Sequence, residues 1–86
     1  MYRLVLSREA QRIYTTAEVP LARKLARCFA RLEIEPRSGN NVKALKGPLE
    51  GSFRYRVGDY RVVYSISEST QVVTVITIAH RRDVYD

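Results

Sequence analysis

The spacing of apolar residues predicts a strand and then a helix at the start of the chain. Residues 2–6, with the sequence YRLVL, are mostly apolar, as in a short and largely buried strand. Ser7 is a typical N-cap residue, and Glu9 places a negative charge in the first helical turn, where the helix dipole stabilises it. The apolar residues that follow lie three or four positions apart and predict the first helix: Ala10, Ile13, Tyr14 and Ala17.

A second helix is predicted between Pro20, which suits the first turn of a helix, and Pro36, which disfavours helical geometry at Glu35. Its apolar residues again recur every three or four positions: Leu21, Leu25, Cys28, Phe29 and Leu32. Four basic residues fall largely away from this stripe: Arg23, Lys24, Arg27 and Arg31. They form a solvated polar face or a surface that contacts RNA or an acidic partner, and the pattern leaves both interpretations open.

The second half of the chain begins with a loop and continues with a period of two. Residues 36–51 carry three of the four glycines and two of the three prolines, which predicts a connecting loop. Three of its apolar residues are expected to anchor it on the core: Val42, Ala44 and Leu45. Strands are predicted at residues 53–57, 60–67 and 72–79. The last of them, VVTVITIA, is apolar on both faces and is expected to be central in the sheet.

The resulting order, β-α-α-β-β-β, predicts an α+β domain in which a helical hairpin packs on a small, mainly antiparallel twisted sheet. The 86 residues suffice for a single domain, residues 1–86, and are too few for two. Cys28 is the only cysteine and is expected to be a small buried apolar residue. The chain contains neither a signal-peptide pattern nor the roughly 18 apolar residues of a membrane span, so we expect a soluble, cytoplasmic protein without a membrane partner.

Residues 53–64, FRYRVGDYRVVY, predict a hairpin with two different faces. Gly58–Asp59 is expected to be a two-residue turn, which sets Val57 opposite Tyr60. In this register one face belongs to the core: Phe53, Tyr55, Val57, Tyr60, Val62 and Tyr64. The other face carries three arginines, the last two directly opposite each other: Arg54, Arg56 and Arg61. Because like charges that face each other across strands are destabilising, we expect something to compensate them.

The overall charge points to an anionic partner, either nucleic acid or an acidic protein. The chain has 15 Lys and Arg against 9 Asp and Glu, a net charge of +6 at pH 7, and 12 of the 15 are arginine, which suits bidentate phosphate or carboxylate recognition. The hairpin arginines are therefore either edge charges that deter aggregation or a phosphate cradle. The end of the chain, AHRRDVYD, is either a frayed polar terminus or a source of further site residues: His80, Arg81, Arg82 and Tyr85.

The motif YRVGDYRVVY, the apolar strand after it and the terminal HRRDVY together resemble the RelE branch of the RelE/ParE toxin superfamily. The resemblance extends over essentially the whole chain, including LKGPLEG before the hairpin. It implies a RelE-like fold and a toxin of a type II toxin–antitoxin pair that cleaves mRNA in the ribosomal A site. The implied partners are the ribosome, mRNA and a cognate RelB-like antitoxin, which would hold the toxin inactive in a hetero-oligomeric complex.

The same resemblance assigns roles to single residues. Arg54 and Arg56 match basic residues, often lysines, that lie along the substrate phosphates. Arg61 matches the arginine of the YR motif, to which transition-state stabilisation is assigned, and Arg81 matches an arginine implicated in leaving-group or phosphate chemistry. Tyr85 matches a tyrosine near the end that stacks on a base or acts as general base.

RNA cleavage by attack of the 2′-hydroxyl needs a base, an acid and cations that stabilise the developing charge. One histidine and scattered carboxylates do not make a metal-ligand cluster, so we expect no metal and no other cofactor. Arg54 and Arg56 cannot exchange protons at neutral pH, which leaves Tyr85 and His80 as candidates for the base. If the strand continues to Arg81, that residue and His80 point to opposite faces, and we then favour Tyr85.

Three classes of function remain. The first is a ribosome-dependent endoribonuclease, in which the ribosome orients the mRNA for a sparse site. The second is a ParE-like inhibitor of DNA gyrase on the same fold, which requires none of the nuclease residues. The third is a non-catalytic RNA-binding module, whose binding would be sensitive to salt.

Overall fold

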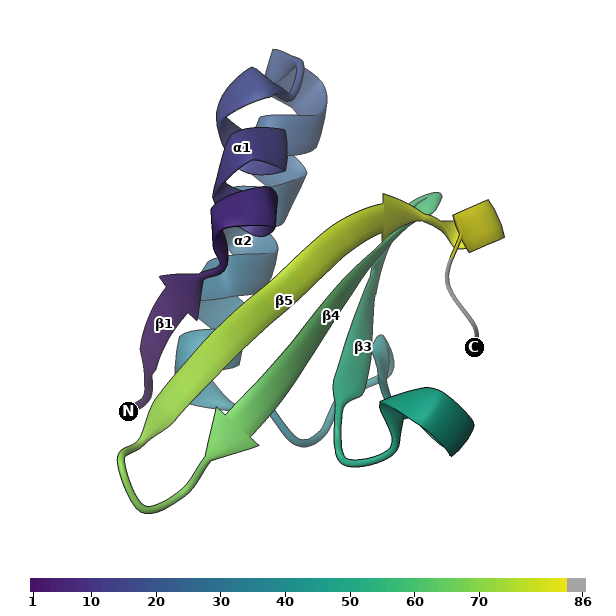
Figure 1. Ribbon diagram of the computed structural model, residues 1–86. Helices are drawn as coiled ribbons and strands as arrows, with labels where there is room; N and C mark the ends of the chain where they lie inside the picture. The colour runs from purple at the N-terminus through teal and green to yellow at the C-terminus, as the bar shows by residue number, and fades with distance from the viewer. Residues whose placement is uncertain (84–86) are drawn as a thin grey trace.

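In the computed structural model, which describes residues 1–83, a five-stranded sheet carries two helices on one face (Figure 1). Two short 3-10 helices, η1 and η2, follow the strands β2 and β5. The elements run in the order β1 (Arg3–Leu6), α1 (Arg8–Thr16), α2 (Val19–Ile34), β2 (Val42–Ala44), η1 (Gly47–Leu49), β3 (Phe53–Val57), β4 (Tyr60–Ser67), β5 (Val72–His80) and η2 (Arg81–Asp83). Among the described residues, no helix is long and apolar enough to cross a membrane.

The sheet has the strand order β1-β5-β4-β3-β2. Strand β1 pairs parallel to β5, whereas the three other pairs of neighbours are antiparallel. The predicted α+β class and the helical hairpin on a mainly antiparallel sheet are therefore confirmed. Strand β5 lies inside the sheet, as its apolar sequence predicted, but β4 is the middle strand.

One strand was not predicted. Residues 42–44 lie within the expected loop, yet they form β2 and pair with β3 at the sheet edge. Of the three expected anchors, Leu45 is buried and Val42 is half-buried, whereas Ala44 is exposed, so the prediction for Ala44 was wrong. A three-residue edge strand has too little alternation to be predicted from sequence, because its existence depends on a partner nine or more residues away.

The helix boundaries follow the predicted capping. The Ser7 hydroxyl accepts a hydrogen bond from the Ala10 backbone N–H at 3.0 Å, which satisfies one donor of the first turn of α1. Pro20 lies in the first turn of α2, and the helix ends before Glu35, whose backbone is extended as expected for a residue before proline. Cys28 is buried on this helix, and burial raises the pKa of its thiol to about 12.

The core forms where the apolar faces of the helices meet the sheet. Its buried residues come from both layers: Leu25, Cys28, Phe29 and Leu32 on α2, and Val62, Tyr64, Val73 and Val75 on the sheet. The Tyr64 hydroxyl donates a buried hydrogen bond of 2.7 Å to the Pro36 carbonyl. This bond attaches the segment after α2 to the middle strand, so the large side chain is buried without an unsatisfied polar group.

Three side chains from distant segments form what we call the N-terminal clasp: Tyr2, Arg37 and Glu68. The Tyr2 hydroxyl donates to the Glu68 carboxylate at 2.9 Å, and Arg37 Nη2 lies 2.7 Å from the same carboxylate. The hydrogen bond from Arg37 is the main reason why the pKa of Glu68 is lowered. The clasp therefore links the start of β1, the loop after α2 and the β4–β5 turn through one ionised group.

Because the folded protein lowers the pKa of Glu68, the clasp stabilises the fold above the ordinary pKa range of a glutamate and loses this effect as pH falls. We expect Glu68→Gln to be less stable than the wild type at about pH 7, and the difference to narrow as the pH approaches about 3. Urea denaturation at several pH values measures the free energy of unfolding of both proteins. Glu50→Gln removes an equal charge outside the clasp and is the control, and a Glu68→Gln deficit that does not change with pH would contradict the account.

Candidate functional site

The β3–β4 hairpin has the predicted register. Val57 pairs with Tyr60 and Arg56 lies opposite Arg61, so Gly58–Asp59 is the two-residue turn. Gly58 has a φ of +57°, a left-handed conformation that glycine adopts at little cost and that such turns require at their first central position. The local sequence thus fixes which residues of the hairpin share a face.

The two faces of this hairpin also agree with the prediction. On the core face, the rings of Phe53 and Tyr64 stack with their centroids 5.8 Å apart. On the opposite face lie Arg54, Arg56 and Arg61, because successive side chains of a strand alternate. The arginines are therefore directed away from the helices.

Arg61 is a buried charge, with only 7% of its surface exposed. Its Nη1 atom donates hydrogen bonds to the Gly58 carbonyl at 3.3 Å and to the Tyr60 carbonyl at 3.1 Å. A buried guanidinium requires such acceptors because it has lost its hydration. Arg61 is thus held against its own turn, and it forms part of the wall of the site instead of extending into solvent.

Three of the predicted residues, Arg56, Arg61 and Arg81, line one hollow of about 550 Å³. We call this the arginine hollow; its described lining residues are Asn41, Arg56, Gly58, Asp59, Arg61 and Arg81. Arg81 reaches it from η2, which lies beyond the end of β5 and beside the hairpin turn (Figure 1). The end of the sheet therefore brings Arg81 to two arginines that precede it by 25 and 20 positions, Arg56 and Arg61.

Arg54 lies beside this hollow and not in its lining. Its Nη1 atom donates to the Asn41 carbonyl at 2.9 Å, and the same carbonyl accepts the Arg56 backbone N–H at 2.9 Å. Asn41 was not singled out from the sequence, because it lies in a loop and acts here through its backbone. The predicted substrate-binding pair is thus divided, with Arg56 in the hollow and Arg54 next to it.

His80 lies on the other face of the sheet. It is paired with Tyr60, and the two rings meet edge to face at 5.6 Å on the side covered by the helices. A β-bulge causes this placement: Val63 pairs with Thr77 but Tyr64 with Val75, so one extra residue of β5 reverses the alternation. The imidazole Nδ1 accepts the Arg82 backbone N–H at 3.3 Å. The structure therefore does not bring His80 to the arginine hollow.

The strand ends at His80 and Arg81 starts η2, so the condition that the strand continues to Arg81 is not met. The side chains of the two residues nevertheless diverge, because the turn into η2 carries Arg81 toward Asp59. Tyr85, the other candidate for the base, lies outside the described residues. Within residues 1–83, no three His, Cys, Asp or Glu side chains gather in a group that would hold a metal ion.

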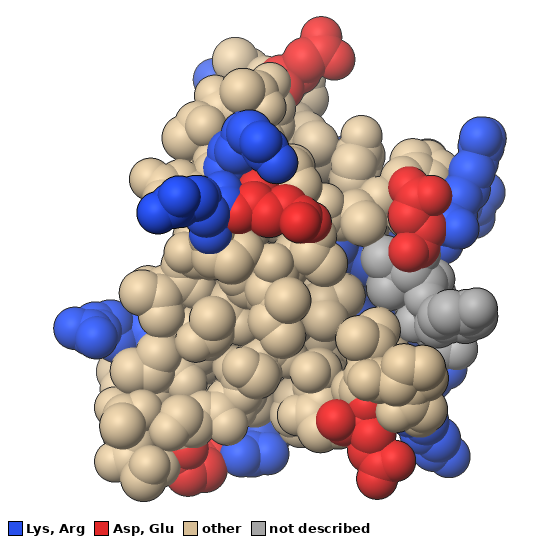
Figure 2. All heavy atoms as spheres, viewed as in Figure 1, with Lys and Arg blue, Asp and Glu red and all other residues tan. Residues whose placement is uncertain are grey.

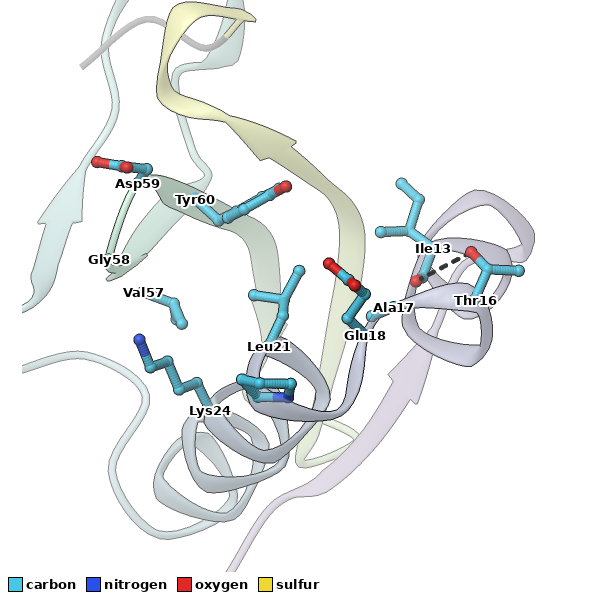
Figure 3. A pocket seen from close by; sticks show the side chains of 11 residues that line it. Ile13, Thr16, Ala17, Glu18, Leu21, Lys24, Val57, Gly58, Asp59 and Tyr60 are labelled. Atoms are coloured by element: carbon cyan, nitrogen blue, oxygen red, sulfur yellow. Dashed lines mark hydrogen bonds between the residues drawn. The ribbon is translucent and has the colours of Figure 1, made fainter.

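A second hollow, the apolar groove, lies on the other side of the hairpin turn (Figure 3). It has a volume of about 530 Å³ and separates the α1–α2 junction from the turn. Apolar side chains form most of it, among them Ile13, Leu21 and Tyr60, and Gly58 and Asp59 line both this groove and the arginine hollow. Figure 3 shows the Asp59 carboxylate pointing away from the apolar side chains. The turn is therefore the wall shared by the two hollows.

The charged residues are distributed unevenly over the face of the sheet that points away from the helices. Figure 2 shows uncharged side chains over the centre of this face, with charged side chains of both signs near its periphery. A polyanion is therefore not attracted uniformly to this face. The arginine hollow, at the end of the hairpin, is where guanidinium groups from three elements, β3, β4 and η2, meet.

Comparisons with known proteins agree with this geometry. A family model described as ParE toxin of type II toxin-antitoxin system, parDE, matches residues 5–85. Toxin RelG of Mycobacterium tuberculosis is 37% identical over 43 residues, which are 50% of this chain and 49% of that protein, so the chain spans about half the length of this curated relative.

Two solved structures are similar over nearly the whole chain, each at 25% identity. The toxin–antitoxin complex RelBE2 from Mycobacterium tuberculosis aligns with a TM-score of 0.80 and covers 93% of this chain and 98% of that one. The archaeal RelE–RelB complex from Pyrococcus horikoshii aligns with a TM-score of 0.81, over 96% and 98%. Both have the arrangement of helices and sheet described above.

The left-handed backbone of Gly58 leads to a stability prediction. Gly58→Ala is expected to lower the free energy of unfolding by about 1 kcal/mol, because an L-residue with a Cβ is strained in this conformation. Gly58→Asn is the matched control, since asparagine tolerates the left-handed region, and we expect a clearly smaller loss. Urea denaturation compares the three proteins, and equal stability of all three would contradict the described turn.

Proposed function

We propose that this chain, which belongs to the ParE toxin family of type II toxin–antitoxin systems, is a ribosome-dependent endoribonuclease that cleaves mRNA in the ribosomal A site. The observation that supports this most directly is the arginine hollow. Arg56, Arg61 and Arg81 converge there from three different elements. Such a cluster fits the phosphate of an RNA backbone better than it fits a neutral substrate.

In the proposed reaction, the 2′-hydroxyl attacks the adjacent phosphorus and the bond from phosphorus to the 5′-oxygen breaks. The products are a 2′,3′-cyclic phosphate and a 5′-hydroxyl end, whose oxygen takes up its proton from water, and no metal takes part. The guanidinium groups of Arg61 and Arg81 stabilise the charge that develops on the phosphate oxygens. Arg61 suits this role because its hydrogen bonds to the turn hold it in place before substrate arrives. Arg56 binds the scissile phosphate, and Arg54 binds a neighbouring one.

We assign proton abstraction from the 2′-hydroxyl to Tyr85. The location of His80 beside Tyr60, on the face covered by the helices, supports this choice over the imidazole. A phenol is a weak base at neutral pH, but guanidinium groups close to a phenol favour its ionised form. The arginine residues themselves cannot act as the base, since they stay protonated.

The site depends on the ribosome for substrate orientation. The side chain of Arg81 is 62% exposed, and a hollow that is open to solvent does not by itself align a flexible RNA for in-line attack. Alignment of the reacting groups lowers the activation barrier of many enzymatic reactions by a large part. In this proposal the ribosome supplies that alignment. We accordingly place the activity in the cytoplasm, where translation occurs.

The proposed protein partner is a cognate RelB-like antitoxin that inhibits the toxin in a hetero-oligomeric complex. Both similar structures described above are complexes of a toxin with its antitoxin. The net charge of +6 favours association with an acidic segment, which would also compete with RNA for the arginines. The arginines of the arginine hollow thus bind RNA during catalysis and the antitoxin in the inhibited complex.

A second function is supported by one observation, namely that the matching family model is described by the ParE toxin of the parDE system. A ParE-like gyrase inhibitor would use the same fold without a nuclease site. It would leave ribosome-bound mRNA intact and would inhibit supercoiling. The two functions are therefore separable by experiment.

Primer extension on mRNA in programmed ribosomes tests the proposal. We expect the wild type to produce new ends at the A-site codon, and Arg61→Ala to reduce cleavage by about a hundredfold or more, as for the loss of other charge-stabilising donors. Arg23→Ala, an exposed residue of α2, is the control and should cleave normally. If burial makes Arg61→Ala unstable, the exposed Arg81→Ala provides the same test. Intact mRNA with the wild type would contradict the proposal, and inhibited supercoiling would then favour the second function.

Removal of Arg56 and Arg61 together should separate catalysis from inhibition. We expect this double variant to lose toxicity in induced cells by more than it loses affinity for the antitoxin, because an antitoxin contacts more surface than one hollow. Growth after induction and the Kd for the antitoxin measure the two effects. Equal losses would mean that the arginines serve mainly as an antitoxin-binding surface.

A further inference from the structure

The hairpin turn provides hydrogen-bond acceptors for both arginines to which charge stabilisation is assigned. The carbonyls of Gly58 and Tyr60 accept from Arg61, and the carbonyl of Asp59, between them, accepts the Arg81 backbone N–H at 2.8 Å. Three consecutive residues therefore fix the positions of Arg61 and Arg81 relative to each other. This arrangement joins η2 to the hairpin across the end of the sheet.

Asp59 adds a second contact through its side chain. Its Oδ1 atom lies 3.9 Å from Arg81 Nε, and the two side chains are 68% and 62% exposed. An ion pair this exposed contributes little to the free energy of folding. A carboxylate in the lining of the arginine hollow also weakens the attraction of an anionic substrate. A turn accepts asparagine as well as aspartate, so neither the ion pair's contribution to stability nor substrate affinity accounts for the negative charge at this position.

We propose that Asp59 is a positioning residue, which holds the Arg81 guanidinium at the mouth of the arginine hollow in the orientation that the reaction uses. This inference rests on the proposed endoribonuclease function. Asp59 does not contact the reacting atoms; it acts through Arg81, whose backbone and side chain it contacts together. A long arginine side chain has many rotamers, and a partner at one side selects among them.

The inference predicts that Asp59→Asn lowers both kinetic constants, kcat and KM. Asp59→Asn keeps the turn, since asparagine is favoured in turns as aspartate is, but it removes the charge. For cleavage on programmed ribosomes, we expect kcat to fall by about tenfold because Arg81 is no longer oriented. We expect KM to fall by about two- to fivefold because a negative charge has left the hollow. Loss of structure alone would not lower both constants.

Asp83→Asn is the matched control. It removes the same charge two residues after Arg81, but Asp83 lines a different hollow, with Leu49 and Val63. Its kcat should remain within about twofold of the wild type. Unfolding measured by urea confirms that both variants fold, and Asp59→Ser, which also suits a turn, replaces Asp59→Asn if that variant does not.

The outcomes separate this inference from the proposed function. Cleavage by the wild type with a reduced kcat and a reduced KM for Asp59→Asn supports both. Cleavage by the wild type with an unchanged kcat for Asp59→Asn, or with only a raised KM, overturns the positioning role and leaves the nuclease intact. If a folded wild type does not cleave mRNA on programmed ribosomes, the proposed function is overturned. The positioning role of Asp59 is then overturned as well.

Discussion

The register of the β3–β4 hairpin is the constraint on which both the core and the site depend. It is set by the two-residue turn at Gly58–Asp59, and a slip by one residue would exchange the two faces of the hairpin. Tyr64 would then leave the core and lose its hydrogen bond to Pro36. The arginines would enter an apolar layer without acceptors, at a cost that no fold of this size tolerates. Core packing and site chemistry thus enforce the same register.

The turn also explains how a small domain keeps a buried guanidinium. Arg61 has lost most of its hydration, and carbonyls of the turn replace it. The resulting cation is fixed in direction before any ligand binds, which is the condition under which a charge stabilises a transition state most effectively. The turn residues Gly58 and Asp59 also line the apolar groove, so a change in the turn would alter both the groove and the arginine hollow.

Most of the fold was predictable because its signals are local: capping by Ser7, the helical stripe that ends before Pro36, and the alternation on either side of Gly58–Asp59. The features that escaped prediction depend on pairing between distant segments. Strand β2 exists only because β3 lies beside it. The side on which His80 lies depends on a bulge within β5, since simple alternation from Val73 and Val75 would have put it with the arginines. The contact between Asp59 and Arg81 likewise requires η2 to reach the turn.

The central claim is that the arginine hollow, and not the basic surface of α2, receives an RNA phosphate backbone. Titration of the labelled protein with a 2′-O-methylated RNA oligonucleotide, which cannot be cleaved, tests it most directly through the arginine Nε–Hε signals in NMR spectra. We predict that the signals of Arg56, Arg61 and Arg81 shift together while those of Arg23 and Arg27 stay in place. Shifts confined to Arg23 and Arg27 would contradict the account and would assign RNA binding to α2.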